Sequence, residues 1–347
     1  MILIQVLFPF LMVASGQPTH LTNDTFDLTG QTPIIVSDSL IGPAVIKYNS
    51  VVNSDTGFVF KAITGAVFKD ITFIGPNGDT HIKETGYLGC IRVWSTAVIE
   101  NCRFINFDKW HIDIRSNRHT LSDTTYIRNC YFTGAKRDGY GYSIWTQYGT
   151  ALIENCIFES GRHFIDGSSE GHRIILRNCS FDHAYESALH SHRYTDGFSG
   201  AGMDIINCFF GKNATDIDIQ PPFPPAVHRI EGNTHYSGIS TGFWIKPLTG
   251  VIATVGTDTI PNGKWVYRLY RSGAVVRVSG TGTCFIDDWI QGDKYYPMED
   301  VTPPATTKTP KIKYVSGSTK ADRSVSDQVS GDKALRLRLT ESVVTVE

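Results

Sequence analysis

The sequence has little charge and little methionine, and long segments with helical periodicity are hard to find in it. Charged residues make up 19% of the 347 residues, and there are 4 methionines. The formal net charge is −2, and the absence of a basic excess argues against a nucleic-acid partner. Runs of valine, isoleucine, threonine, phenylalanine and tyrosine are broken by glycine, asparagine and aspartate. This texture predicts an all-β protein.

Long hydrophobic runs are also scarce. The apolar run Ile2–Val13 is too short to span a bilayer as a helix. It is typical of a secretory signal, with Ala14 and Gly16 placed for cleavage, although no basic residues precede it. We therefore expect residues 1–16 to be a signal peptide of a secreted or extracellular protein without a membrane span; the alternative is a buried first strand. Three N-x-S/T sequons are compatible with secretion: Asn23, Asn178 and Asn213.

A short motif recurs along the middle of the chain. Its five clear copies are VIENCRF (98–104), YIRNCYF (126–132), LIENCIF (152–158), ILRNCSF (175–181) and DIINCFF (204–210), and VFKDITF (67–73) and RIEGNTHY (229–236) are degenerate. The anchor residues are Asp70, Asn101, Asn129, Asn155, Asn178, Asn207 and Asn233, at spacings of 31, 28, 26, 23, 29 and 26. A variable period of this length without a helical signature predicts a β-solenoid with one coil per repeat.

The residue types inside one repeat agree with this interpretation. Cysteine and phenylalanine lie one and three positions after the anchor, so strand alternation points both inward. Asparagine suits a tight bend because it tolerates a positive φ, and stacked amides can bond along the axis. The pattern resembles the right-handed parallel β-helix of the pectin-lyase-like superfamily, with its asparagine ladder, over roughly residues 40–247. The resemblance implies the fold; that superfamily hosts many activities.

Five of the 7 cysteines lie in the motif copies, at Cys102, Cys130, Cys156, Cys179 and Cys208. Zinc sites usually show cysteine or histidine pairs at short local spacing, which are absent here. Disulfides between stacked parallel side chains have poor dihedral geometry. We therefore predict that these cysteines are reduced and buried in the core.

The pattern changes after the last repeat. We expect the β-helix to occupy residues 17–250, followed by a small β cap or accessory module over 251–300, where KWVYRLYRSGAVVRVSG indicates two alternating strands. Residues 301–311 are rich in proline and threonine and are typical of a linker. The C-terminal tail, 312–347, ends in an apolar run that suits docking or exchange between chains, which would give a homo-oligomer.

Aligning the strand that follows each motif places a distinctive set of side chains on one outward face. One column contains Arg92, Asp113, Trp145, Asp166, His190, Asp218 and Trp244, and its neighbour contains Trp94, Arg115, Gln147, Ser168, His192, Gln220 and Lys246. A plain solvated face would favour lysine, glutamate, threonine and serine, whereas tryptophan rings stack on sugars. Seven coils about 4.8 Å apart form a strip that suits a linear polysaccharide. The loops add Lys136, Arg137, Asp138, Arg162, His163, Glu170, His172 and Glu186.

In the superfamily that the chain resembles, the exposed parallel face is where pectate lyases and polygalacturonases bind polysaccharide. The closely paired aspartates of polygalacturonases and a clear pectate-lyase arginine motif are missing, so the resemblance implies a substrate class, with an acidic polymer favoured, and no mechanism. The predicted catalytic residues are Asp166, His190, His192 and Asp218. The predicted substrate-binding residues are Arg92, Trp94, Asp113, Arg115, Trp145, Gln147, Arg162, His163, Gln220, Trp244 and Lys246.

Two mechanisms fit these residues, and a third function stays open. In an inverting hydrolase, Asp166 and Asp218 would stand two coils apart, about 9.6 Å at the backbone. In a lyase, His190 or His192 would remove the proton next to a uronate carboxylate, and arginine or a bound Ca²⁺ would neutralise that carboxylate. No other cofactor is indicated. The third function is glycan binding without cleavage, as in a tailspike-like adhesin.

Overall fold

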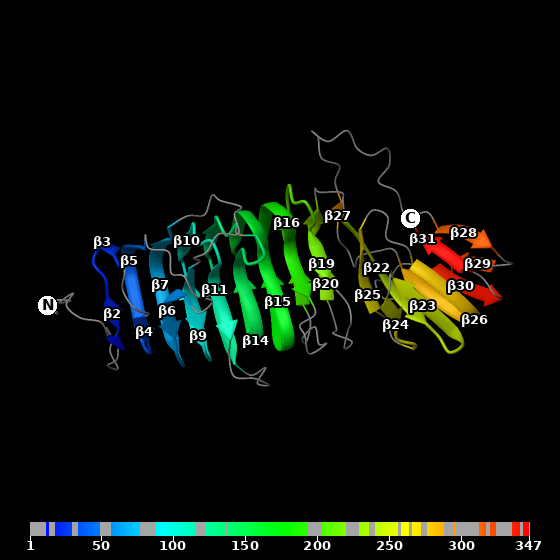
Figure 1. Cartoon of the computed structure of the whole chain (residues 1–347), viewed down its shortest axis with the longest axis horizontal. Helices are drawn as coiled ribbons and strands as arrows, with labels where there is room; N and C mark the ends of the chain where they lie inside the picture. The colour runs from blue at the N-terminus through cyan, green and yellow to red at the C-terminus, as the bar shows by residue number, and fades with distance from the viewer. Residues whose placement is uncertain are drawn as a thin grey trace.

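The computed structural model describes residues 12–13, 18–29, 34–48, 57–76, 88–115, 123–136, 138–192, 203–219, 229–235, 240–255, 258–263, 266–271, 276–287, 294–295, 312–316, 320–323, 335–340 and 343–346. Within these ranges the chain is all-β and contains no helix, as the sequence predicts. One 22-stranded sheet is parallel, and a 7-stranded and a 2-stranded sheet are antiparallel. Figure 1 shows the strands stacked along the long axis of the molecule.

The parallel sheet contains most of the strands. They are β1 (Met12–Val13), β2 (Thr19–His20), β3 (Thr25–Asp27), β4 (Ile34–Val36), β5 (Ser39–Lys47), β6 (Phe58–Ala62), β7 (Ala66–Ile74), β8 (Gly89–Val93), β9 (Ala97–Glu100), β10 (Arg103–Ile105), β11 (Trp110–Arg115), β12 (Thr124–Arg128), β13 (Tyr131–Thr133), β14 (Tyr142–Glu154), β15 (Ile157–Arg177), β16 (Ser180–His192), β17 (Met203–Ile206), β18 (Phe209–Phe210), β19 (Ile217–Ile219), β20 (Arg229–Glu231), β21 (Thr234–His235) and β27 (Lys294–Tyr295).

Three lines of parallel pairing run along this sheet. The first line joins β6, β8, β11, β14, β15, β16 and β19. The second joins β7, β9, β12, β14, β15, β17 and β20. The third joins β7, β10, β13, β15, β16, β18 and β21. Strands that lie one repeat apart in sequence therefore pair in parallel along all three lines.

The anchor residues make the bend between the second and third lines. Asp70 and the five motif asparagines all have φ between 53° and 59°, a left-handed conformation that asparagine tolerates better than most residues. Side-chain hydrogen bonds connect anchor residues of successive repeats: Asn101 Nδ2 donates to Asp70 Oδ1 at 3.0 Å, and Asn178 Nδ2 donates to Asn155 Oδ1 at 3.4 Å. These asparagines are exposed, so the ladder lies at the surface and not inside the coil.

The last repeat departs from the predicted anchor. The register pairs Ile230 with Ile205 and Thr234 with Phe209, and Gly232 has the positive φ, at 69°. Asn233 thus takes the cysteine position, where it is buried and accepts a bond from the Cys208 amide at 2.7 Å. Glycine replaces asparagine at the bend because it has no Cβ to strain the left-handed conformation.

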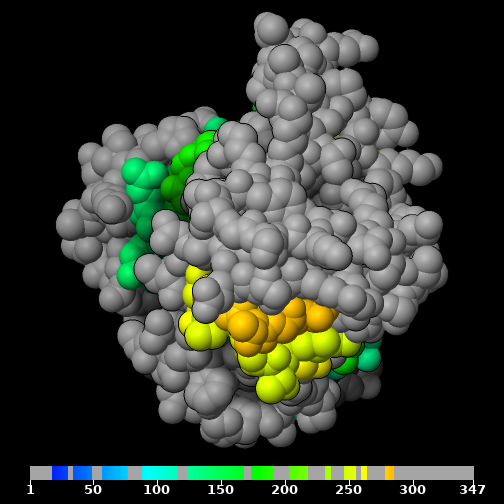
Figure 2. Space-filling view, turned by 90° about the vertical axis from the view of Figure 1, so that its right-hand side faces the viewer, coloured from blue at the N-terminus to red at the C-terminus, as the bar shows by residue number. Residues whose placement is uncertain are grey.

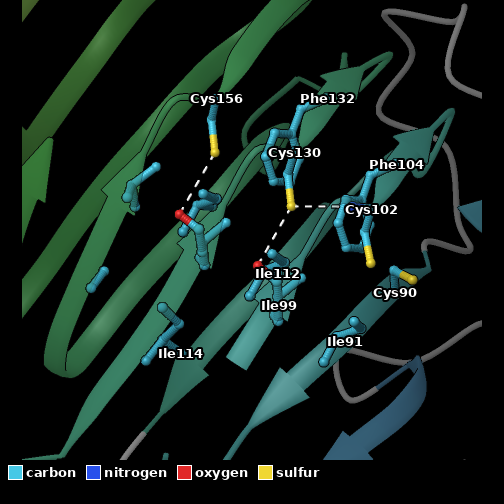
Figure 3. Close-up of a cluster of buried hydrophobic side chains, with 14 of the residues drawn as sticks. Cys90, Ile91, Ile99, Cys102, Phe104, Ile112, Ile114, Cys130, Phe132 and Cys156 are labelled. Carbon is cyan, nitrogen blue, oxygen red and sulfur yellow. Dashed lines mark hydrogen bonds between the residues drawn. The ribbon is translucent and has the colours of Figure 1, made fainter. Parts of the chain in front are cut away.

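The core repeats the same side chains in each coil, as Figure 3 shows for Cys102, Cys130, Cys156, Phe104 and Phe132. All seven cysteines are buried and none of them forms a disulfide, as predicted for the five in the motif. The phenylalanine rings form one continuous stack through Phe73, Phe104, Phe132, Phe158, Phe181 and Phe210, with successive centroids 4.7–5.1 Å apart. The stack ends on the ring of His235, 4.6 Å from Phe210. The Nδ1 atom of His235 lies 2.9 Å from Oδ2 of buried Asp216, so a polar pair stands at this end of the phenylalanine stack.

The C-terminal part of the chain is antiparallel. The 7-stranded sheet contains β22 (Ser240–Pro247), β23 (Val251–Val255), β24 (Asp258–Ile260), β25 (Val266–Arg271), β26 (Val276–Asp287), β29 (Lys320–Arg323) and β30 (Leu335–Thr340), and β28 (Ile312–Ser316) pairs with β31 (Val343–Val346). Strand β22 lies inside the range expected for the β-helix, yet it pairs antiparallel with β25 and β26. Figure 2 views this end of the molecule, with β23 and β26 in yellow and orange.

Two expectations fall wholly or mostly outside the described residues. Of the expected signal segment, only 12–13 are described, as strand β1, which pairs parallel with β4. The expected linker at 301–311 lies outside the described ranges. The expected tail is described only as β28 to β31, and β29 and β30 extend the antiparallel sheet.

We expect acid to destabilise the protein through His111, which is buried between Phe104, Phe107 and Phe132. Burial lowers the pKa of His111 from 6.5 to about 3. Between these values the unfolded chain binds one more proton than the folded chain, so stability falls as the pH drops below 6.5. The loss from this residue should be about 2 kcal/mol at pH 5. Urea unfolding at several pH values measures it.

The variant His111→Phe should remove this part of the pH dependence, because a phenyl ring has no proton to bind. His183→Asn, at an exposed histidine whose left-handed φ of 60° asparagine tolerates, is the control for replacing a histidine, and its pH dependence should stay steeper than that of His111→Phe. Equal slopes for His111→Phe and the wild type would contradict the prediction.

Candidate functional site

The first line of strands carries the candidate site. Its register places six predicted residues side by side on neighbouring strands, in the order Arg92, Asp113, Trp145, Asp166, His190 and Asp218. We call these six the acid–base row. The sequence alignment of this column is therefore confirmed up to Asp218. Trp244 does not continue it, because Trp244 lies on β22 opposite Tyr267 and Asp287 in the antiparallel sheet.

The second predicted column is not continuous. A bulge in β14 pairs Arg115 with Tyr148, so Gln147 is displaced from the column, and an inserted residue shifts every side chain after it. Ser168 still pairs with His192, whereas Lys246 lies on antiparallel β22. Gln220 lies outside the described residues, as do the side chains of His192, Asp218 and Trp244.

Four members of the acid–base row are buried and Trp145 is half-buried, although an open outward strip was expected. Asp113 and Asp166 have no exposed surface, and Arg92 and His190 retain 3% and 8%. Trp145, a member of the row, packs against two other aromatic rings. Its ring centroid lies 5.6 Å from that of Trp110 and 5.5 Å from that of Tyr142. Alternation along a single strand does not predict this burial.

A second row of side chains lies beside the acid–base row. Trp110, Tyr142, His163 and Ser187 pair successively on β11, β14, β15 and β16, and we call them the ring row. Sequence reasoning placed His163 in a loop and missed Trp110 and Tyr142. A usable signal existed, because each member stands three residues before a member of the acid–base row. Two inward residues separate them, which strict alternation of period two does not predict.

Two arginines share one carboxylate at the N-terminal end of the acid–base row. Arg92 Nε and Arg115 Nε each lie 2.8 Å from Asp113 Oδ2. The Arg92 guanidinium also lies over the rings of Phe58 and Trp110, at 4.5 and 5.1 Å from their centroids. Burial raises the pKa of Asp113, and the two guanidinium groups oppose that rise. This end of the row therefore holds more positive than negative charge.

An acid–imidazole pair occupies the other end. His190 Nδ1 lies 2.9 Å from Asp166 Oδ2. A carboxylate can only accept, so Nδ1 carries the proton and Nε2 is the nitrogen that neutral His190 offers as a base. The ring of His190 stacks on that of His163 at 4.4 Å, with an angle of 6° between the planes. This arrangement gives His190 a fixed tautomer and a fixed ring plane.

Glu186 holds the ring row in place at this end. Arg162 Nε donates to Glu186 Oε1 at 2.9 Å, and Arg162 Nη2 lies 2.9 Å from Oε2. His163 Nε2 lies 3.1 Å from the same Oε2. The bond from His163 and the guanidinium of Arg162 lower the pKa of Glu186 to about 2, against partial burial. Glu186 is thus an ionised clamp on both residues, a role that its predicted loop position did not indicate.

Tyr142 lies between the two ends of the site. Its ring stacks on His163 with centroids 5.8 Å apart, and its hydroxyl donates to Gly139 O at 3.2 Å. Burial and the charge of Asp166 raise the pKa of Tyr142 well above its ordinary value, although Arg162 acts in the opposite direction. The phenol therefore stays protonated across the physiological range.

Two predicted residues stand at the edge of this surface. The Trp94 ring is 42% exposed, and Lys61 Nζ lies 5.0 Å from its centroid. Gln147 is buried, and with its amide oxygen turned toward the guanidinium it accepts bonds from Arg115 Nε and Nη2 at 3.1 Å. Among the described side chains, no group of three or more histidine, cysteine, aspartate or glutamate residues is arranged to hold a metal ion.

Comparisons with known proteins do not define a family for this chain. No protein-family model matches it, and no curated protein matches it. A solved structure, the crystal structure of the Dettilon tailspike protein, is similar at 10% identity and a TM-score of 0.19, covering 93% of this chain and 86% of the tailspike chain. A likeness at that TM-score does not establish a shared fold. None of the described residues forms a helix long and apolar enough to cross a membrane.

Proposed function

We propose that this chain is a secreted, carbohydrate-active protein built on a right-handed parallel β-helix. It binds a linear acidic polysaccharide over the outward face of the first line of strands and cleaves it by elimination, with His190, which retains 8% exposure, as the base. One observation carries the proposal: His190 Nδ1 lies 2.9 Å from Asp166 Oδ2, on a strand face that also holds Arg115 and Arg162. A buried imidazole with a fixed tautomer beside cations suits removal of a proton next to a carboxylate.

The proposed step balances its protons and electrons. His190 Nε2 removes the proton from the carbon next to the uronate carboxylate, and the electron pair forms a carbon–carbon double bond. The bond to the leaving glycosidic oxygen breaks, and Tyr142 gives that oxygen the proton that its hydroxyl otherwise donates to Gly139 O. Arginine side chains balance the negative charge that develops on the carboxylate. A Ca²⁺ ion remains an alternative neutralising group.

Elimination is favoured over inverting hydrolysis by the state of Asp166. An inverting hydrolase needs two carboxyl groups that reach the sugar and a water from opposite sides. Asp166 is fully buried and bonds to His190, so it acts on the substrate only through the imidazole. Asp218 pairs with His190 in the register, and its predicted role as the second carboxylate stays a prediction, as does that of His192.

The variant His190→Asn tests this function. The asparagine amide can still donate to Asp166 but cannot take up a proton, so the fold should persist while cleavage falls by about 100-fold or more. The measurement uses linear uronic-acid polymers with neutral glucans as negative substrates, and follows reducing ends and the ultraviolet absorbance of the unsaturated product. His183→Asn, at an exposed histidine on the same strand, is the matched control.

The two readouts separate the mechanisms. Reducing ends with absorbance support elimination, whereas reducing ends without absorbance would replace it by hydrolysis. Full activity in a folded His190→Asn protein would remove His190 from the mechanism.

Glycan binding without cleavage is the second candidate function. The exposed ring of Trp94 and the 40% exposed ring of Tyr140 favour it, because flat aromatic faces stack on sugar rings. Binding of a polymer without release of reducing ends or unsaturated product would support this function. Under this function, oligomer formation through the C-terminal tail would contribute to glycan binding by presenting several copies of the site together.

A further inference from the structure

His163 stands between two hydrogen-bond acceptors. Its Nδ1 lies 3.1 Å from the backbone oxygen of Ser187, and its Nε2 lies 3.1 Å from Glu186 Oε2. A backbone oxygen only accepts, and an ionised carboxylate only accepts. The side chain is 97% buried, since 3% of it is exposed, so water competes little for these bonds.

A neutral imidazole has one N–H and one bare nitrogen, so it can satisfy only one of these two acceptors. The bare nitrogen would then face an oxygen lone pair inside the protein, which is unfavourable. We propose that the stacked His163–His190 pair takes up its first extra proton on His163, which then carries a proton on each ring nitrogen, so that His190 stays neutral. His163 is thus a positioning residue that keeps His190 able to accept a proton.

Charged and titratable groups from three strands face His163. Glu186 and Asp166 favour the cation, whereas His190 and Arg162 oppose it, and the phenol of Tyr142 stacks on its other side. Burial is the largest effect and lowers the pKa of His163 from 6.5. We therefore expect His163 to carry both ring protons only below neutral pH. An isolated imidazole would begin to be protonated in the same pH range.

The two rings cannot both bind an extra proton easily. Their centroids are 4.4 Å apart, and two like charges at that distance repel, so the pair takes up its protons in separate steps. Both ring nitrogens of His163 face acceptors at 3.1 Å, so we expect the first extra proton of the pair on His163. The link to catalysis rests on the proposed function, whereas the position of the protons does not.

The test is a nitrogen NMR titration of the full chain labelled with ¹⁵N-histidine, across the pH range in which histidines titrate. Signals are assigned with His163→Gln and His190→Gln. We expect both nitrogens of His163 to show bound protons at acidic pH while His190 shows one proton, on Nδ1. A doubly protonated His190 appearing before His163, or a His163 with one proton throughout, would overturn the proposal.

The variant Glu186→Gln sharpens the test. It keeps the shape of the side chain and removes its charge, so the midpoint of His163 should fall by about one pH unit or more. The midpoint of His190 should rise, because its neighbour no longer holds the charge. Glu159→Gln, at a carboxylate that bonds to Tyr131 instead, is the matched control and should move neither midpoint.

An unchanged His163 midpoint in Glu186→Gln would overturn the role given to Glu186. If Glu186→Gln does not fold, the titration of the wild-type chain still decides the proton positions. No substrate enters this experiment. A lack of polysaccharide cleavage would therefore contradict the proposed function and leave the assignment of the protons unaffected.

Discussion

Replacing Phe158 by alanine should lower the free energy of unfolding by about 3–5 kcal/mol. Phe158 has no exposed surface and stacks between Phe132 and Phe181, with centroids 4.7 and 4.9 Å away. In a stacked array each coil contacts only its neighbours, so no distant layer compensates for a cavity in the middle of the stack. Equilibrium urea unfolding measures the loss.

The adjacent residue on the same strand provides the control. Ile157 is 46% exposed, so Ile157→Ala should change the stability by about 0.5 kcal/mol or less. A comparable loss in both variants would mean that the strand responds to any change, and a loss well below the expected range in Phe158→Ala would contradict the importance of the ring stack.

Replacing Asp113 by asparagine should cost about 3–5 kcal/mol of stability, because it leaves two guanidinium groups without their shared counter-charge. Asp113 and Arg92 are buried, so water cannot replace the lost carboxylate. Arg92 Nε and Arg115 Nε both lie 2.8 Å from the same oxygen. Thermal and urea unfolding of Asp113→Asn measure the effect.

A second carboxylate between two arginines gives a matched control at the surface. Glu154 lies 3.2 Å from Arg128 Nε and 3.1 Å from Arg177 Nη1, and these arginines are 43% and 49% exposed. Glu154→Gln should therefore cost about 1 kcal/mol or less, since solvent screens such pairs. Equal costs in the two variants would show that burial does not set the energy of the Asp113 cluster.

The candidate site could be predicted from the sequence only in part. Lining up the inward aliphatic residues placed Arg92, Asp113, Trp145, Asp166 and His190 in one column, and the strand register agrees. The same method failed for the second column within β14, where a bulge displaces Gln147. It also failed at Trp244, whose strand pairs antiparallel, because an alternating apolar strand has the same sequence pattern in either sheet.

The sequence by itself determined the repeat, the bend residues and the core. Cysteine and phenylalanine at constant distances from Asn155 and its equivalents specify which side chains face inward, and this information is local to each repeat. The tertiary structure decided the burial of Asp166 and the bond from His190. It also decided the clamp of Glu186 on His163. These contacts join residues more than 20 positions apart in the sequence. They depend on how neighbouring strands align, which no single repeat encodes.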